Sequence, residues 1–438
     1  MKNKFFAKFD YFLILVVLSL VTLGILFIYS SSVNSEGISV TNEHIKQIIW
    51  ASIGFVFMVS LTLYDFRKFE KVSIYLYIGL IILLIYTYFF GRLVNGAKSW
   101  IGIGDFGIQP SEFGKVFFIL FLAHYLNDSK NELPIKRFIK AMIILCVPMG
   151  LILIQPDLGT ASVYLPIFIV MCFIAGIPSK YLMFLISFGV CTVVFAVLPV
   201  WNSEIAEKPL IIISILTNFK LRAILIFATF IIALIGIIIR RYFHGPDYIN
   251  WITYVFFIIS LSLIFSLLLA KVLKDYQIKR LIIFMNPNVD PRGSGWNIIQ
   301  SKIAIGAGGL LGKGYLRGTQ SHYRFLPQQS TDFIFSILSE ELGFLGCCVV
   351  FLLFLFIFVR TIFIARSSTS SYGSYIASGI LGMFAFHFFV NVGMVMGMMP
   401  ITGIPLSFLS YGGSSLLTSM SCIGLLMSIN YRDRKSVV

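Results

Sequence analysis

Long apolar runs recur along the whole chain and alternate with short polar segments. Twelve of these runs approach the roughly 20 residues that an α-helix needs to cross a bilayer. They lie near residues 11–30, 47–64, 72–90, 110–126, 140–156, 158–177, 181–200, 221–239, 250–270, 332–359, 374–396 and 412–430. The pattern predicts an all-α polytopic membrane protein with about twelve transmembrane helices.

Composition supports one transmembrane domain over residues 1–438, because 58% of the residues are hydrophobic and only 12% are charged. Soluble domains carry roughly 25% charged residues to cover their surface. The first run follows Lys2, Lys4 and Lys8 but is longer than a signal-peptide core and lacks a cleavage pattern of small residues. It is therefore predicted to remain as a helix. All six cysteines fall inside apolar runs, which is typical of packed side chains and not of disulfides or zinc ligands.

Basic residues set the expected orientation. Clusters such as Arg67–Lys71, Lys136–Lys140 and Arg240–Arg241 fall at alternate ends of the runs, together with the basic residues at both chain ends. The short segments on the other side hold few basic residues: Lys46, Arg92, Lys98, Lys208, Lys220 and Arg222. This asymmetry predicts that both termini are cytoplasmic. Attraction to the anionic inner leaflet also accounts for the net charge of +15 without a nucleic-acid partner.

Residues 272–331 form a long extracytoplasmic segment with a formal charge of +6. Its basic and acidic residues are Lys274, Lys279, Arg280, Arg292, Lys302, Lys313, Arg317 and Arg324 against Asp275 and Asp290. Loops of this length are usually functional. Trp296–Ile305 is apolar enough for a short interfacial or re-entrant helix. The glycine-rich run 306–314 then allows an anion site built from backbone N–H groups and Lys313, or a flexible turn; the basic surroundings favour the anion site.

Several ionisable residues lie close to apolar runs, where an unpaired charge is costly. Glu112 and Lys115 stand i, i+3 behind Pro110, so they can pair on one helix face, for function or for structure alone. Asp157 is predicted to cap the next helix. His387, within an apolar helix, is predicted to be a hydrogen-bonded core histidine.

Asp332 opens a long apolar helix directly behind the basic segment. Two interpretations stand side by side: Thr331 or Asp332 caps the helix, or the Asp332 carboxylate faces a positively charged cavity. Glu340 and Glu341 follow two turns deeper as expected partners of buried donors. Motifs for zinc proteases, nucleotide binding or dinucleotide binding are absent from the sequence.

A set of motifs in fixed order gives the chain a family resemblance. The motifs are Gln109–Glu112, Gln155–Thr160, Trp296–Gly306, Gly312–Gly314, Gly318–Ser321, Phe325–Pro327, Thr331–Phe335, Gly403–Leu406 and Ser410–Ser414. Together they resemble the SEDS family (shape, elongation, division and sporulation) over nearly the whole chain. Within the family the pattern is closer to the RodA-type elongation branch than to the FtsW-type division branch.

The resemblance implies a peptidoglycan glycosyltransferase that polymerises lipid II at the outer face of the bacterial cytoplasmic membrane during cell elongation and rod-shape maintenance. It implies that Asp332 is the general base. The residues expected to bind substrate are Lys98, Trp100, Glu112, Lys115, Lys302, Lys313, Arg324 and Ser414. The expected partners are a class B penicillin-binding transpeptidase and other membrane proteins of the elongation complex. No cofactor is certain, and a divalent cation is the one candidate.

The sequence departs from the family pattern in several places. Family members usually have ten transmembrane helices. The two extra spans lie between residues 202–204 and 275–277, and an inserted region at about 201–249 is predicted to contribute to them. Gln328, Ser330 and Ser407 stand where Glu, His and Pro are usual, and Ser99 stands where Arg often precedes Trp100. These changes exclude a catalytic histidine ahead of Asp332 and leave the aspartate in place.

Two other classes of function fit the apolar pattern, a lipid II flippase and a non-catalytic scaffold of the wall-synthesis complex. A carboxylate behind a basic outer segment favours chemistry, because a flippase needs no base on one side only.

Overall fold

The computed structural model describes residues 10–94, 97–103, 106–204, 211–243, 246–272, 275–287, 290–291 and 293–436. The chain divides into two compact units. Unit 1 combines Met1–Ile177 with Asn297–Val438, and unit 2 is Pro178–Trp296.

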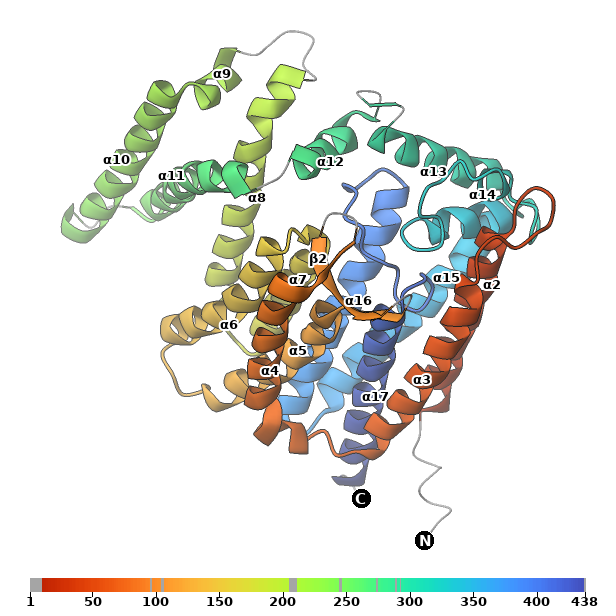
Figure 1. Ribbon diagram of the computed structural model, residues 1–438. Helices are drawn as coiled ribbons and strands as arrows, with labels where there is room; N and C mark the ends of the chain where they lie inside the picture. Colours follow the sequence, from red (N-terminus) through yellow and green to blue (C-terminus); the bar gives the residue numbers. More distant parts are fainter. Residues whose placement is uncertain are drawn as a thin grey trace. The chain divides into compact units, whose positions relative to one another are not determined.

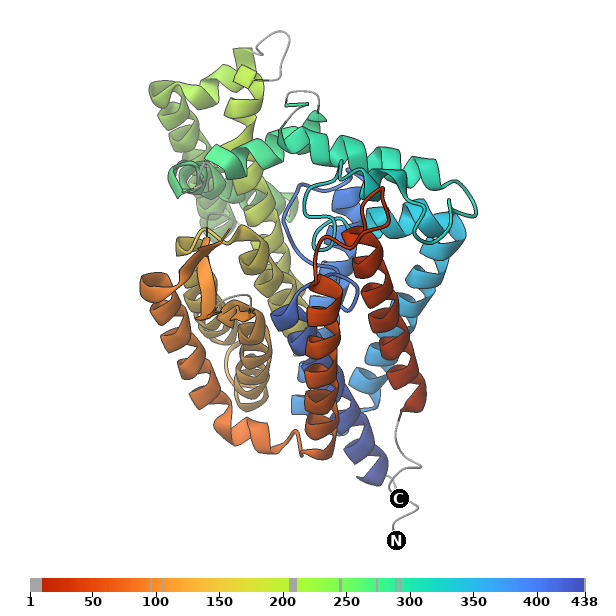
Figure 2. The same ribbon diagram turned by 45° about the vertical axis from the view of Figure 1, so that its right-hand side comes forward.

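Unit 1 is a bundle of long helices that run alternately up and down (Figure 1). They are α2 (Tyr11–Ser32), α3 (Glu43–Leu63), α4 (Lys68–Phe90), α5 (Pro110–Asp128), α6 (Pro134–Ile154), α7 (Leu158–Ile174), α15 (Ile334–Ser367), α16 (Ser371–Val395) and α17 (Gly413–Ser436). The start of α2 and the end of α17 lie at the same end of the bundle in both views (Figures 1 and 2). We call the opposite end, where α2 finishes and α15 begins, the site end.

The helix α16 forms the centre of unit 1. Most residues of α16 are buried, as are most of those of α17, whereas α3, α4 and α6 leave much of their length exposed. It packs against α7, α15 and α5, while α17 packs along α3. The helices α2, α3, α4, α6 and α15 expose broad apolar faces, as helices surrounded by lipid do, since acyl chains replace protein as their apolar neighbours.

Shorter elements of unit 1 lie at the site end. The helix α13 (Ser294–Gly308), which begins in unit 2, and the short α14 (Thr319–His322) precede α15. Between α4 and α5 the strands β1 (Arg92–Val94), β2 (Ala97–Ile103) and β3 (Phe106–Ile108) form an antiparallel sheet in the order β1-β2-β3. The sequence predicted the α13 helix but no strand.

Unit 2 consists of helices alone in its described residues. These are α8 (Ser179–Glu204), α9 (Ile211–Thr217), α10 (Phe219–Phe243), α11 (Tyr248–Val272) and α12 (Asp275–Met285), besides the first residues of α13. The helices α10 and α11 pack as an antiparallel pair, and α11 also packs against α8. The predicted insertion at about 201–249 covers α9 and α10, but its residues 205–210 and 244–245 lie outside the described residues.

The predicted fold class is confirmed: each of the twelve apolar runs corresponds to a helix. Nine described helices are long and apolar enough to cross a membrane, and α7 is a shorter apolar helix. Helix bounds differ most where polar residues continue a helix beyond its apolar part. The α6 helix begins at Pro134 and not near 140, and α15 continues to Ser367 and not 359.

Candidate functional site

Asp332 lies at the site end, immediately before α15, and is partly exposed. Its backbone N–H donates to the Gln328 carbonyl at 3.1 Å. The side-chain amide of Asn391, on α16, donates to the Asp332 carbonyl at 3.0 Å and to the Ile404 carbonyl at 2.8 Å. The N-cap position of α15 is Phe333, so the prediction that Thr331 or Asp332 occupies this position is wrong.

The residues just before Asp332 are fixed to two other parts of unit 1. The side-chain amide of Gln329 donates to the Ser31 carbonyl at the end of α2, at 2.7 Å. The Ser330 carbonyl accepts from the backbone N–H of Tyr411 at 2.8 Å. Tyr411 belongs to residues 396–412, which connect α16 to α17 and which we call the late loop. Residues 329–332 are thus attached to α2 through the Gln329 side chain, and to the late loop and α16 through the carbonyls of Ser330 and Asp332.

Glu112 and Lys115 form a buried ion pair on α5, with 2.6 Å between Lys115 Nζ and Glu112 Oε1. The same ammonium lies 3.2 Å from Nε2 of His387 on α16, and Nδ1 of His387 lies 2.9 Å from the Pro405 carbonyl of the late loop. The pairing predicted from the i, i+3 spacing is confirmed. His387 is buried with both ring nitrogens in contact with a partner, as predicted for a core histidine.

A second polar cluster joins the starts of α5, α7 and α17. Asp157 caps α7 as predicted, accepting from the backbone N–H of Thr160 at 3.0 Å and from its hydroxyl at 2.8 Å. Gln109 donates its side-chain amide to Asp157 at 2.7 Å and its backbone N–H to the Ser414 hydroxyl at 3.0 Å. Burial raises the pKa of the Asp157 carboxyl, against the opposing effect of the Thr160 hydrogen bonds.

The glycine-rich run docks on a break in α15. Gly343 has φ 65° and ψ −163°, which interrupts the helical hydrogen bonds there. The Lys313 and Gly314 N–H groups donate to the carbonyls of Glu340 and Glu341 at 3.0 and 2.9 Å, and Phe344 N–H donates back to the Gly309 carbonyl at 2.9 Å. A side chain at Gly312 would meet the Glu341 backbone. The glycines therefore allow two backbones to approach closely. The backbone N–H groups of residues 313 and 314 already donate to carbonyls, which counts against an anion-binding site at these two residues.

Two buried carboxylates organise the segment behind this break. Glu340 accepts from the Lys313 ammonium at 2.7 Å and from the Thr319 backbone N–H at 2.8 Å. Glu341 accepts from the Ser30 hydroxyl and from the Leu316 N–H. The prediction that both glutamates serve buried donors is confirmed. Lys313, predicted to bind substrate, is placed in this ion pair with its side chain 30% exposed.

The other predicted substrate-binding residues occupy separate positions at the site end. Lys98 and Trp100 lie on β2, Lys98 exposed and Trp100 packed over Gly107. Lys302 on α13 extends along Gly397 of the late loop. Arg324 is exposed with φ 57°. The structure thus links Glu112 and Lys115 to the Asp332 region through α16, whereas Lys98 and Arg324 are not part of that network of contacts.

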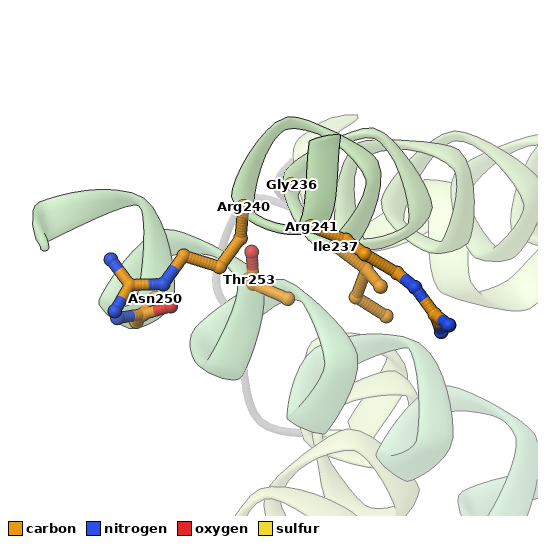
Figure 3. A pocket seen from close by; sticks show the side chains of 6 residues that line it. All are labelled: Gly236, Ile237, Arg240, Arg241, Asn250 and Thr253. Carbon is orange, nitrogen blue, oxygen red and sulfur yellow. The ribbon is translucent and has the colours of Figure 1, made fainter. Parts of the chain in front are cut away.

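Two further features of the described residues lie outside this network. The one cluster there with metal-ligand spacing is Glu70, His124 and Asp128, whose ligand atoms lie within 4.8 Å of one another at the end of unit 1 opposite Asp332. In unit 2 a cavity of about 240 Å³ lies between α10 and α11. Figure 3 shows Arg240 extending from α10 toward Asn250, and this arginine pairs with Asp247 at 3.0 Å.

Comparison with known proteins settles the family. The model of the FtsW/RodA/SpoVE family, described as cell cycle protein, matches residues 10–435. The chain belongs to this family.

Individual relatives match over nearly their whole length. The peptidoglycan glycosyltransferase RodA of Treponema pallidum (strain Nichols) is 55% identical over 430 residues, covering 98% of each chain. The peptidoglycan glycosyltransferase MrdB of Escherichia coli (strain K12) is 32% identical, covering 98% of this chain and 96% of that protein. A solved structure described as a peptidoglycan synthase complex that coordinates polymerization and crosslinking has a TM-score of 0.67, with 26% identity and coverage of 97% and 98%. The predicted resemblance is confirmed.

Sequence reasoning missed one functional candidate of this FtsW/RodA/SpoVE protein. Asn391 is fully buried and is the α16 side chain that contacts the backbone of Asp332. An asparagine within an apolar run is a signal in itself, because its amide must find partners when no water is near. The sequence contained that signal, but it could not name the two carbonyls that accept from it.

Proposed function

We propose that this chain is a RodA-type peptidoglycan glycosyltransferase that polymerises lipid II into glycan strands during cell elongation and rod-shape maintenance. The observation that carries the proposal is the 55% identity to a RodA over 98% of both chains. Such identity over the full length includes the bundle, the long segment before α15 and the late loop. The position of Asp332 adds support, since Asp332 and the two residues before it are attached to α2, to α16 and to the late loop.

Asp332 is the proposed general base. The 4-hydroxyl of the terminal GlcNAc on lipid II attacks C1 of the donor MurNAc and gives its proton to the Asp332 carboxylate. The bond between C1 and the diphosphate oxygen breaks with inversion, and undecaprenyl diphosphate leaves with the electron pair. A positioned base contributes about 10²- to 10⁴-fold to such a step.

Basic residues at the site end are proposed to stabilise the leaving diphosphate, whose charge grows in the transition state. Lys302 and Arg324 are exposed and available for this role, as is Lys98 on β2. Lys313 would have to share its ammonium between the diphosphate and Glu340. Glu112, Lys115 and Ser414 are buried. Our proposal is that they and Trp100 shape the substrate site from within the bundle.

The chain is a multi-pass membrane protein, and we place it in the bacterial cytoplasmic membrane with both termini in the cytoplasm. The site end then faces outward, which agrees with the basic residues Arg67, Lys68 and Lys71 at the opposite end. Residues 272–331 form the extracytoplasmic catalytic segment in this proposal, and about 201–249 the inserted region.

The proposed partner is a class B penicillin-binding transpeptidase, which cross-links the strands that this chain makes. A similar solved structure is described as a complex that coordinates the two activities. Other membrane proteins of the elongation complex are the further expected partners.

The proposal is tested with the purified full chain in liposomes supplied with fluorescent lipid II. Glycan ladders on a gel are expected, and a parallel assay measures lipid II crossing the bilayer. Transfer of lipid II without polymer would identify a flippase. If the chain makes no polymer and transfers no lipid II even when the transpeptidase is present, the result would support the scaffold function.

A further inference from the structure

Two side chains of α16, one turn apart, hold two consecutive carbonyl groups of the late loop. Asn391 Nδ2 lies 2.8 Å from the Ile404 carbonyl oxygen, and His387 Nδ1 lies 2.9 Å from that of Pro405. Residues i and i+4 share one face of a helix. One face of a largely buried helix therefore fixes this part of the late loop.

The contacts of His387 determine its tautomer. The Lys115 ammonium, 3.2 Å from Nε2, has only donors, so Nε2 must accept. Nδ1 then carries the hydrogen and donates to the Pro405 carbonyl, which can only accept. The neutral ring thus acts as a spacer of fixed length between the Glu112–Lys115 pair and the late loop.

The contacts of Asn391 use both hydrogens of its amide nitrogen. One goes to the Ile404 carbonyl and the other to the Asp332 carbonyl, at 2.8 and 3.0 Å. The flipped orientation would place Oδ1 against two carbonyl oxygens, so the donors fix the orientation of the amide. Asn391 is 0% exposed, and water cannot replace these bonds without entering the core.

We propose that Asn391 is a positioning residue for Asp332. His387 assists it by holding the neighbouring Pro405 carbonyl of the late loop at a fixed distance from Lys115. Asn391 sets the distance between the backbone of Asp332 and the late loop and does not touch substrate itself. The inference rests on the proposed glycosyltransferase activity. A general base acts only within hydrogen-bond reach of its proton, and a misplacement of about 1 Å can cost about 10²-fold in rate.

The experiment compares Asn391→Ala, Asn391→Gln and wild type in the purified full chain. Asn391→Ala is expected to lower kcat for lipid II polymerisation by about 10²-fold, with KM little changed, because the substrate contacts remain. Asn391→Gln keeps both amide hydrogens and is expected to recover part of kcat. The matched control is Ser378→Ala, a buried α16 residue whose hydroxyl bonds within its own helix to the Ser374 carbonyl at 2.7 Å. It is expected to keep the wild-type kcat.

A second measurement does not depend on activity. Hydrogen exchange of the peptide 328–335 is expected to accelerate more than that of the other peptides in Asn391→Ala, and not to change in Ser378→Ala. The double variant Asn391→Ala with His387→Leu is expected to show a smaller fold-loss of kcat than the product of the two single fold-losses. The reason is that both side chains act on the same loop segment.

The outcomes separate the two proposals. A wild type that makes no polymer overturns the proposed function, whereas unchanged exchange of 328–335 in Asn391→Ala overturns the positioning role. A wild-type kcat in Asn391→Ala, or an equal loss in Ser378→Ala, also overturns it.

Discussion

The ammonium of Lys115 lies 3.2 Å from the imidazole of His387, although 272 positions separate these residues in the chain. Together with Glu112 they place a charged pair in the core of the bundle, where each charge has a partner. Leaving either charge unpaired there would be costly, so the cluster fixes α5 against α16. The same α16 face carries Asn391, which connects this core to Asp332.

Asp332→Asn is expected to reduce polymerisation by at least about 10²-fold, because the amide keeps the shape of the carboxylate but cannot take the proton. Lipid II binding and the thermal midpoint are expected to stay near wild type. Gel analysis of glycan products and a lipid II binding assay measure the two effects. Near-normal polymer from this variant would remove Asp332 from the role of base.

Lys313→Ala is expected to destabilise the protein by about 1.5 to 3 kcal/mol, because the buried Glu340 carboxylate loses its charged donor and keeps only neutral ones. The control is Lys140→Ala, which removes an exposed pair with Glu132 of similar length, 2.7 Å, and is expected to destabilise the protein much less, because solvent screens both charges. Unfolding in detergent is followed by tryptophan fluorescence. Equal shifts in the two variants would show that the Glu340 pair has no special structural role.

Gly343→Ala is expected to cost about 1 to 3 kcal/mol, because this residue has φ 65° and lies against the backbone of the glycine-rich run. The matched control is Gly306→Ala within α13, where an added methyl group meets nothing within 4 Å. That variant is expected to be neutral or slightly stabilising, since alanine favours a helix. Limited proteolysis shows whether Gly343→Ala makes the segment between α13 and α15 more accessible to cleavage. If both glycines tolerate alanine equally, the break in α15 does not depend on glycine.

Single cysteines are expected to report the orientation of unit 1. In a background without the native cysteines, Leu311→Cys places a thiol at the site end and Asn131→Cys places one at the opposite end, both at exposed positions. An impermeant maleimide added to intact spheroplasts is expected to label position 311 alone. Labelling of position 131 alone would invert the proposed topology.

Co-purification from native membranes is expected to recover a class B transpeptidase with this chain. Polymerisation is expected to rise when the two are reconstituted together, if the partner acts on the late loop that Asn391 and His387 hold. The control is the same reconstitution with a catalytically inactive transpeptidase, which is expected to stimulate as well. Absence of both association and stimulation would contradict this part of the proposal.

The sequence predicts some elements of this fold and misses others, for physical reasons. The hydrophobic runs predicted every long helix, because a span of about 20 apolar residues is a local requirement of the bilayer. The i, i+3 spacing of Glu112 and Lys115 and the cap at Asp157 were also predictable, since their partners lie within one turn. The sheet at 92–108 was not predicted, because its strands are short and stabilised by pairing with one another.

The sequence by itself determined the membrane bundle, the family and the candidate base Asp332, since each depends on runs or motifs that are contiguous in the chain. Only the tertiary structure decided what the glycine-rich run and Asn391 do. The run approaches a helix break at Gly343, and Asn391 reaches carbonyls of Asp332 and Ile404. Backbone carbonyls occur at every residue, so no sequence pattern marks which of them a distant side chain will meet; packing of the helices selects them.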